Sequence, residues 1–574
     1  MTLNLLPRPR SVEPAAPTGR VPRREPEARR DPTLPPQSYG LRIDDAGVVL
    51  VAADDAGAFY GRATLDQLAR LTGDGALPAC RVHDWPDQAV RGVMLDVSRD
   101  KVPTLETLRA LVDRLASWKV NQLQLYLEHT FAYRDHEDVW RDASPYAAED
   151  IQALDAYCRE RFVELVPNQN CLGHMARWLR HERYRDLAVA PGGYEQFGRH
   201  RPPGTIEPSK PGSLALVREL LAELLPNFTS QRVHVGLDEP FELPAERVDE
   251  YLDWVRRLRA LPELAGREML MWGDMVAGHP ERIAALPDDL TICEWGYEDW
   301  HPFDEHGAQY TAAGRPFWVC PGTSSWLTIL GRVTNMRADI TNAVAAARAH
   351  GAAGLLNTDW GDMGHLQYLP VSEPGFAYGA AAAWCLEANR DLDLADALSV
   401  HGFDDPTGEL AHALLELGDV YLRVTPQFPN LSTLVFHLYQ PQLRVGQGMT
   451  EGLTVDELAG VELTLASAFG RLAVAAPRRA DGALVLDELR NAIALVQVLI
   501  DDAKARLAGD GSLRAVPQAR RSALAAALQP VIERHRELWL ARNRPGGLDD
   551  SAAWLEHLLR CYEVGETEKD WGEW

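Results

Sequence analysis

Two adjacent carboxylates, Asp238 and Glu239, follow a short apolar run at residues 233–237. Neighbouring residues of a strand point to opposite faces, so the two groups cannot act on one atom as acid and nucleophile. Where a strand ends, however, they can share a site, and one can protonate a leaving oxygen while the other binds a different part of the ligand. The pair predicts catalysis with Glu239 as the general acid and Asp238 beside it. An aspartate that only caps the next helix would give the same pattern.

Other apolar runs also end in acids and tryptophans. The residues at these ends are Asp96, Glu128, Asn170 with His174, Trp272 with Asp274, Glu294 with Trp295, Ser324 to Trp326, and Trp360 with Asp362. Indole faces stack on the C–H faces of sugars, while carboxylates and arginines bind hydroxyl groups. A single tryptophan at such a place is most often a core residue, but three beside glycine or an acid favour a ligand site. The set predicts a carbohydrate ligand.

The distribution of the acids bears on the mechanism. An ordinary retaining glycosidase needs two carboxyl groups about 5–5.5 Å apart, one of them a nucleophile. The seventh run ends in Val319-Cys-Pro-Gly-Thr and carries no acid. This favours substrate assistance, in which the 2-acetamido oxygen of the sugar attacks the anomeric carbon and Asp238 holds the acetamide N–H. An enzyme nucleophile at Glu294 or Glu128 stays open as an alternative, as does a sugar-binding barrel without activity.

Eight apolar or β-branched runs, each ending in polar residues, lie between residues 91 and 362. Helical stretches separate them, among them residues 105–118, 148–161 and 337–350. Eight strands alternating with helices predict an α/β fold of the (β/α)8 TIM barrel type, in which catalytic groups lie at the carboxyl ends of the strands. A doubly wound open sheet is the alternative, but no glycine-rich turn of the kind typical for it follows the first run.

The regions on either side of the barrel have a different character. Residues 1–38 are rich in proline and arginine and predict a loose lead-in, after which two strands and a helix follow. Beyond residue 392 the periodicity is helical, and Pro530 should kink or split the helix expected at 518–542. We expect a C-terminal region that packs against the barrel or against the partner in a homodimer. The expected parts are an N-terminal α/β domain at 1–85, a catalytic barrel at 86–391 and a C-terminal helical region at 392–574.

The composition argues against several classes of partner. The net charge of −25 disfavours nucleic acid, whose phosphates need clustered Lys and Arg, and an anionic membrane surface. The sequence shows no secretory signal and no apolar run of about 18 residues, so we expect a cytoplasmic protein without a membrane partner. The seven cysteines form no C-x-x-C pair, and no strand-end cluster shows metal-ligand spacing. We therefore expect no metal and no cofactor.

Taken together, these motifs resemble glycoside hydrolase family 20. Val235-Gly-Leu-Asp-Glu-Pro resembles the family's Gly-x-Asp-Glu signature, and Arg91-Gly-Val-Met-Leu-Asp-Val-Ser-Arg resembles its first barrel strand. The stretch at 56–68 is similar to a helix of the family's N-terminal domain. The resemblance covers roughly residues 40–390. It implies an exo-acting, retaining β-N-acetylhexosaminidase that acts on a terminal 2-acetamido sugar.

The resemblance also implies roles for single residues. Arg91 corresponds to an arginine that grips hydroxyl groups of the terminal sugar. The other residues carried over are Trp272 and Trp295 as two walls of the acetamide pocket, His174 of a Gly-His loop, and Trp360 with Asp362, whose acid takes distal hydroxyls.

The sequence departs from the family pattern at three places. Leu127-Glu-His-Thr-Phe-Ala-Tyr replaces a Thr-Asp-Asp-Gln run and is more similar to the hexosaminidase D-type branch, which is intracellular and leans toward N-acetylgalactosamine. Glu128 is the candidate for the missing acid. Asn170 stands where the family has an aspartate before the Gly-His loop. Ser324, Ser325 and Trp326 stand where a tyrosine normally donates to the acetamide oxygen, and Tyr297 is the candidate substitute.

Overall fold

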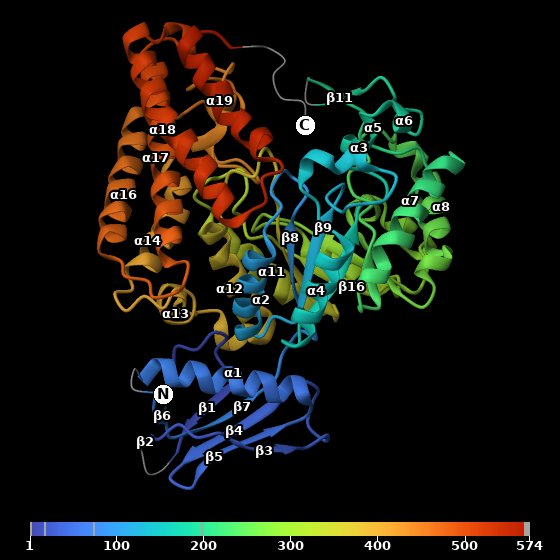
Figure 1. The fold of residues 1–574 in the computed structure, drawn as a ribbon, viewed down its shortest axis with the longest axis vertical. Helices are drawn as coiled ribbons and strands as arrows, with labels where there is room; N and C mark the ends of the chain where they lie inside the picture. The colour runs from blue at the N-terminus through green and yellow to red at the C-terminus, as the bar shows by residue number, and fades with distance from the viewer. Residues whose placement is uncertain (1–2, 16–18, 73–74, 197–198, 568–574) are drawn as a thin grey trace.

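The computed structural model describes residues 3–15, 19–72, 75–196 and 199–567, and its centre is a closed barrel of parallel strands (Figure 1). In chain order the barrel strands are β8 (Val90–Asp96), β9 (Gln122–Leu127), β10 (Glu164–Gln169), β13 (Arg232–His234), β14 (Glu268–Trp272), β15 (Leu290–Trp295), β16 (Phe317–Cys320) and β17 (Gly354–Asp359). β17 pairs in parallel with β8 and closes the ring. The predicted (β/α)8 barrel is confirmed.

Helices connect the strands on the outside of the barrel. The longer ones are α2 (Leu105–Ser117), α4 (Ala148–Arg159), α7 (Pro211–Leu224), α8 (Val248–Arg259), α10 (Phe303–Ala312), α11 (Val333–His350) and α12 (Leu369–Asn389). Shorter elements are α3 (Glu137–Trp140), α5 (Ala176–Leu179), α6 (Glu182–Arg185), α9 (Asp274–Ala277) and the hairpin of β11 (Tyr194–Gln196) and β12 (Arg199–Arg201). In α2, Leu108, Leu111 and Leu115 recur at helical spacing and are buried. These connections bring the carboxyl ends of all eight strands to one rim.

A five-stranded sheet lies below the barrel in Figure 1, with α1 (Asp55–Thr72) between the two. Its strand order is β1 (Ser11–Pro14), β7 (Cys80–Asp84), β4 (Tyr39–Asp44), β5 (Gly47–Ala52) and β3 (Glu27–Arg30), and β2 (Arg20–Val21) pairs separately with β6 (Leu77–Pro78). The loose lead-in predicted for residues 1–38 is wrong, because β1 and β3 pair with β7 and β5. Both are edge strands, which tolerate the proline and charged residues that suggested a loose segment.

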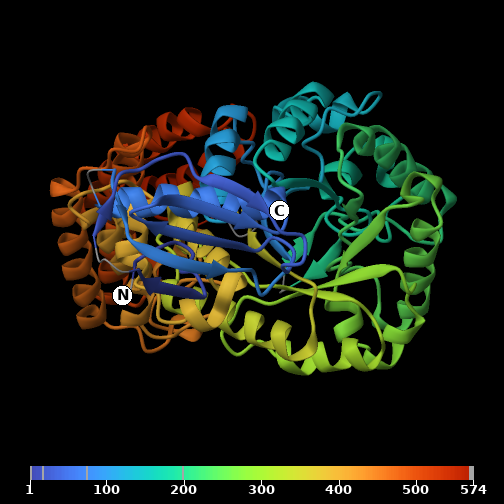
Figure 2. The ribbon, with the colours of Figure 1, turned by 90° about the horizontal axis from the view of Figure 1, so that it is seen from below.

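The C-terminal residues form helices along one side of the barrel (Figures 1 and 2). They are α13 (Leu394–His401), α14 (Glu409–Gly418), α15 (Phe436–Tyr439), α16 (Val455–Val474), α17 (Gly482–Leu507), α18 (Gln518–Arg542) and α19 (Leu548–Val564). Of the kink or split expected at Pro530, the split is wrong, since α18 continues through this residue as one helix. Pro530 and Ala526 are both exposed, so water can bind the carbonyl that lacks its helical donor. Within the described ranges, we find no helix with the length and apolar character needed to cross a bilayer.

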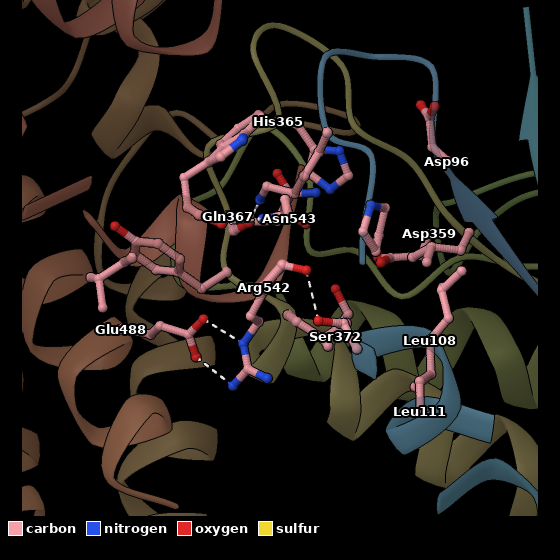
Figure 3. Close-up of a pocket in the computed structure, with 18 residues that line it drawn as sticks. Asp96, Leu108, Leu111, Asp359, His365, Gln367, Ser372, Glu488, Arg542 and Asn543 are labelled. Carbon is pink, nitrogen blue, oxygen red and sulfur yellow. Dashed lines mark hydrogen bonds and ion pairs between the residues drawn. The ribbon is translucent and has the colours of Figure 1, made fainter. Parts of the chain in front are cut away.

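A small cavity separates the barrel from these helices (Figure 3). Its volume is about 30 Å³, and charged side chains such as Lys101, Glu488 and Arg542 are among the residues that line it. Arg542 bonds Glu488 through Nε (2.6 Å) and Nη2 (2.8 Å), and the Lys101 ammonium donates to the carbonyl of Gln367 (2.7 Å). Such a volume holds about two water molecules. The cavity is therefore too small for a sugar, and the rim of the barrel is the candidate place for the ligand.

Candidate active site

Asp238 and Glu239 lie just beyond β13, where the strand has ended. Leu237 (φ 79°) and Glu239 (φ 46°) have left-handed backbone, a conformation that non-glycine residues seldom adopt. The turn abolishes the alternation of a strand, and both carboxylates reach the same histidine. Nε2 of His174 lies 3.2 Å from Oδ2 of Asp238 and 3.6 Å from Oε2 of Glu239.

Asp238 is a buried anion with two partners. Its Oδ1 accepts a hydrogen bond from Nδ2 of Asn170 at 2.8 Å, and its Oδ2 faces His174. Burial raises the pKa of Asp238, but the charge and hydrogen bond of His174 and the amide of Asn170 hold it below the ordinary value. Burial lowers the pKa of His174, but the Asp238 carboxylate outweighs this effect and raises it to about 9. A pKa of about 9 for His174 favours an ion pair with Asp238 at neutral pH.

Glu239 lies in a different environment, with a side chain that is 36% exposed. Burial of its carboxyl group raises the pKa of Glu239, and the neighbouring carboxylates of Asp238 and Asp362 raise it further against the effect of His174. Its backbone N–H donates to Oδ2 of Asp274 at 3.1 Å. The pKa values of two adjacent acids are thus shifted in opposite directions, which is the arrangement that separates a proton donor from an anionic group.

Asp274 links Glu239 to the aromatic residues of the rim. Its Oδ1 accepts the indole N–H of Trp295 at 3.3 Å, while its Oδ2 accepts from the backbone of Glu239. Burial and the nearby Asp238 carboxylate raise the pKa of Asp274 to about 7. The sequence placed Asp274 at the end of a strand, but it gave no sign of this bridging role.

Arg99 is the functional residue that the sequence analysis missed. Its Nε lies 3.1 Å from Oε1 of Glu128, its Nη1 donates to Oδ2 of Asp96 (3.1 Å), and its Nη2 lies 3.2 Å from Nδ1 of His174. The guanidinium also lies over the rings of Tyr126 (4.7 Å) and Trp360 (5.0 Å). The available signal was its place three residues beyond the end of β8, at the carboxyl end of a barrel strand.

Arg91 does not reach this rim, and its predicted contact with the sugar is wrong. It lies at the amino end of β8, and its guanidinium is buried against Tyr60 and Trp384. It donates to the backbone carbonyls of Lys119 (2.8 Å) and Gln88 (2.8 Å). An arginine at the start of a barrel strand and an arginine beyond its end lie at opposite ends of the barrel, and only the second faces Asp238 and Glu239.

The predicted aromatic residues form one continuous cluster. The rings of Trp272 and Trp360 lie 5.8 Å apart, and those of Trp295 and Tyr297 stack at 5.2 Å. The indole N–H of Trp360 donates to the hydroxyl of Tyr297 at 2.7 Å. Trp272 is fully buried against His234 (4.2 Å), whereas Trp295 and Tyr297 are half-buried. The cluster therefore has a buried floor at Trp272 and an accessible wall at Trp295 and Tyr297.

Glu128 and Asp362 lie near Arg99, whereas two serines do not take part in the rim. Burial raises the pKa of Asp362, and the positive charges of Arg99 and His174 lower it in part. Ser325 donates to Asp359 at 2.7 Å, and Ser324 accepts from Nδ2 of Asn335 at 2.9 Å. Both serines are thus engaged in structural hydrogen bonds, whereas the Tyr297 hydroxyl belongs to the aromatic cluster.

Glu294 turns away from the rim cluster toward α10. Its Oε1 bonds Nε2 of His301 (2.8 Å) and Nδ1 of His306 (2.6 Å), and its Oε2 accepts the hydroxyl of Tyr310. The alternative that made Glu294 a nucleophile is therefore wrong, because the carboxylate is occupied on the outside of the barrel. Ligand atoms of Glu294, His301 and His306 lie within 4.8 Å of one another, a proximity that the spacing of these residues in the sequence does not reveal.

Two parts of the chain match one family of known proteins. Residues 89–350 match the catalytic domain of glycosyl hydrolase family 20, and residues 3–85 match domain 2 of the same family. The two matches together cover more than half of the chain.

A β-hexosaminidase of Vibrio furnissii is 27% identical over 248 residues, which are 37% of this chain and 39% of the relative. One from Akkermansia muciniphila is 28% identical over 237 residues, 37% of this chain and 47% of the relative. The chain thus spans less than half the length of these curated relatives.

Solved structures show the same fold. An exo β-N-acetylglucosaminidase from Vibrio harveyi, solved in complex with N-acetylglucosamine, is 18% identical to this chain, with a TM-score of 0.55. The match covers 72% of this chain and 77% of that one.

Proposed function

The chain belongs to glycosyl hydrolase family 20, and on that premise we propose that it is an exo-acting, retaining β-N-acetylhexosaminidase. The observation that carries the proposal is the contrast between Asp238, an ion-paired anion, and Glu239, a partly exposed acid with a raised pKa. The names of the relatives agree with this activity. In the proposed reaction, the 2-acetamido oxygen of the substrate attacks its own anomeric carbon.

Glu239 is the general acid of the proposed reaction. Its raised pKa keeps a proton on the carboxyl group at a pH where an ordinary glutamate would have lost it. Its partial exposure leaves room for the leaving oxygen of a glycoside. After the leaving group departs, the same carboxylate accepts a proton from the water that opens the oxazolinium-type intermediate.

Asp238 binds the acetamide N–H and offsets the positive charge that develops on the acetamide group. Each oxygen of an ionised carboxylate has two lone-pair sites, so Asp238 can accept this bond while it keeps Asn170 and His174. His174 holds Asp238 in its charged form. The acetamide group lies against Trp272, Trp295 and Trp360, and the Tyr297 hydroxyl donates to its oxygen in place of the tyrosine that the family usually has.

Arg99, Glu128 and Asp362 bind the hydroxyl groups of the terminal sugar. Planar guanidinium and carboxylate groups form charge-assisted hydrogen bonds, which discriminate well between hydroxyl orientations. Asp96 positions Arg99, since it accepts from both its side chain and its backbone N–H (3.1 Å each).

The finer predictions concern substrate and setting. We propose N-acetylgalactosamine or N-acetylglucosamine as the terminal sugar, with a lean toward the former that rests on the D-type resemblance around Glu128. The complex of the Vibrio harveyi enzyme supports the gluco sugar equally. A cytoplasmic location and a homodimer also remain proposals. The exposed apolar side chains of Leu463, Phe469 and Val474 on α16 are compatible with a dimer contact, which light scattering would test.

Three aryl glycosides assayed side by side test the proposed activity. We expect hydrolysis of p-nitrophenyl N-acetyl-β-galactosaminide and its gluco isomer, and none of plain p-nitrophenyl β-glucoside, which lacks the acetamide nucleophile. Hydrolysis of the plain glucoside would indicate a carboxylate nucleophile such as Glu128, and binding without turnover would indicate a non-catalytic sugar-binding barrel.

Two inhibitors test the intermediate. A thiazoline analogue of the bicyclic intermediate should bind about 10²-fold or more tightly than the product sugar, as intermediate mimics do. A 2-deoxy-2-fluoro glycoside should not trap the protein, because no covalent bond to the enzyme forms. A stable glycosyl adduct seen by mass spectrometry, together with weak thiazoline binding, would reject substrate assistance.

A further inference from the structure

A second histidine–carboxylate cluster lies on the outer side of the barrel, and we propose that it binds a divalent transition-metal ion, Zn²⁺ above all. Glu294 comes from the end of β15, His301 from the loop that follows, and His306 from α10. Their ligand atoms lie within 4.8 Å of one another. Two imidazoles and one carboxylate are a donor set that zinc uses in proteins, with the fourth position left to water.

The two imidazoles converge on the same carboxylate oxygen. Nε2 of His301 lies 2.8 Å and Nδ1 of His306 2.6 Å from Oε1 of Glu294. The rings stand at 85° to each other, so the nitrogens approach from different directions. Ligands of a tetrahedral zinc ion are separated by about 3.3 Å, given metal–ligand distances near 2.0–2.2 Å. A widening of less than about 1 Å therefore makes room for the ion.

The surroundings suit a metal more than a simple surface ion pair. The Glu294 side chain is only 3% exposed, while His301 and His306 are 19% and 18% exposed, which gives access from the histidine side. Tyr310, one turn after His306 on α10, donates its hydroxyl to the second oxygen of Glu294. A hydrogen-bonded carboxylate is held in the orientation that a metal needs.

The position of the cluster defines its role. Trp295 and Tyr297, which form the accessible aromatic wall, lie in the segment between Glu294 and His301. A metal bound to Glu294 and His301 would therefore hold both ends of this segment in place. The ion would be structural, since the cluster faces away from Asp238 and Glu239. The inference goes beyond the proposed function, because it holds whatever the protein hydrolyses.

Titration of untagged, EDTA-treated protein with Zn²⁺ by calorimetry tests the proposal. We expect one Zn²⁺ per chain in the wild type. Tyr310→Phe should weaken binding by about 10–100-fold, as loss of a group behind a ligand does, and His301→Ala or His306→Ala by more than that. His350→Ala is the matched control, because His350 bonds a single carboxylate, Asp304 (2.8 Å), and should bind Zn²⁺ like the wild type.

Thermal melting of the same proteins covers the case in which a variant does not fold. Zn²⁺ should raise the Tm of the wild type and of His350→Ala, because a ligand that binds only the folded state stabilises it. The proposal is overturned if the wild type shows neither one-to-one binding nor a rise in Tm, or if folded His301→Ala and His306→Ala bind Zn²⁺ as the wild type does. Either outcome leaves the assay of the three glycosides unaffected.

Discussion

Both ends of the barrel gather charged side chains, but the two ends use them differently. At the amino end, Lys119 donates to the hydroxyl of Tyr39 (2.8 Å) and to Oδ2 of Asp84 (3.0 Å). The indole of Trp384 donates to the other oxygen of Asp84 (2.8 Å). These four side chains are fully buried. At the carboxyl end, the Glu239 side chain is one-third exposed and lies 3.6 Å from His174.

This difference separates structural charges from functional ones. A buried charge with every hydrogen bond made is held in one state, and removal of a partner costs about 3–5 kcal/mol of stability. A charged group that can still form further hydrogen bonds and has a shifted pKa can bind a ligand or transfer a proton, and such groups cluster at functional sites. We therefore expect substitutions at the amino end to change stability and substitutions at the rim to change turnover.

Glu239→Gln should have the largest effect on turnover. We expect kcat to fall by about 10²–10⁴ on substrates with poor leaving groups, the usual contribution of general acid catalysis. The loss should be smaller for acidic phenols, which need little protonation. The paired control is Asp84→Asn at the amino end, which should lower the free energy of unfolding in urea and leave kcat of the folded protein nearly unchanged. An equal loss across leaving groups would show that Glu239 has another role.

Asp238→Asn should have the second-largest effect on turnover. We expect kcat to fall by about 10²–10³, the range for removal of one preorganised electrostatic group. Because Asp238 acts on the acetamide, its loss should not depend on the leaving group. Steady-state kinetics over a series of substituted phenyl glycosides would separate the two acids. Near-wild-type activity of Asp238→Ala would reject substrate assistance.

The sequence predicted the barrel and the place of Asp238 and Glu239 at its rim because both depend on local patterns. Alternating apolar runs reveal strands, and the residue after a run lies at the rim. It failed where position along a strand decided the role, as with Arg91. It also failed where partners come from distant segments: nothing near Glu294 in the sequence shows that α10 folds back to place His306 on its carboxylate. The edge strands β1 and β3 were missed because their backbone pairing leaves little side-chain pattern.

Arg91 at the start of β8 and Arg99 beyond its end give a direct test of the comparison. Arg99→Met should lower kcat/KM of the folded protein by about 10–10²-fold, since hydrogen bonds to charged groups are worth about 1.5–3 kcal/mol. Arg91→Met should lower the Tm and leave kcat/KM of the folded protein nearly unchanged, because it leaves the buried carbonyls of Lys119 and Gln88 without a donor far from the rim. Melting curves and kinetics measured on both variants suffice. A loss of activity without loss of stability in Arg91→Met would restore the role that the sequence suggested.

The last expected effect concerns stability and not turnover: it is the pH dependence of unfolding that His174 adds at the rim. The Asp238 carboxylate raises the pKa of His174 to about 9 in the folded protein, against an ordinary value of 6.5. The protonated imidazole thus stabilises the folded state fully below about pH 6.5, and this contribution is lost as the pH rises through 9. A difference of this size corresponds to at most about 3 kcal/mol.

The free energy of unfolding, measured in urea between pH 6 and 10, should therefore fall more steeply in the wild type than in His174→Gln. A control substitution at the exposed His412 of α14 should leave the steep wild-type curve intact. Parallel curves for the wild type and His174→Gln would mean that His174 is neutral in the folded protein, and Asp238 would then need another source of positive charge to remain an anion.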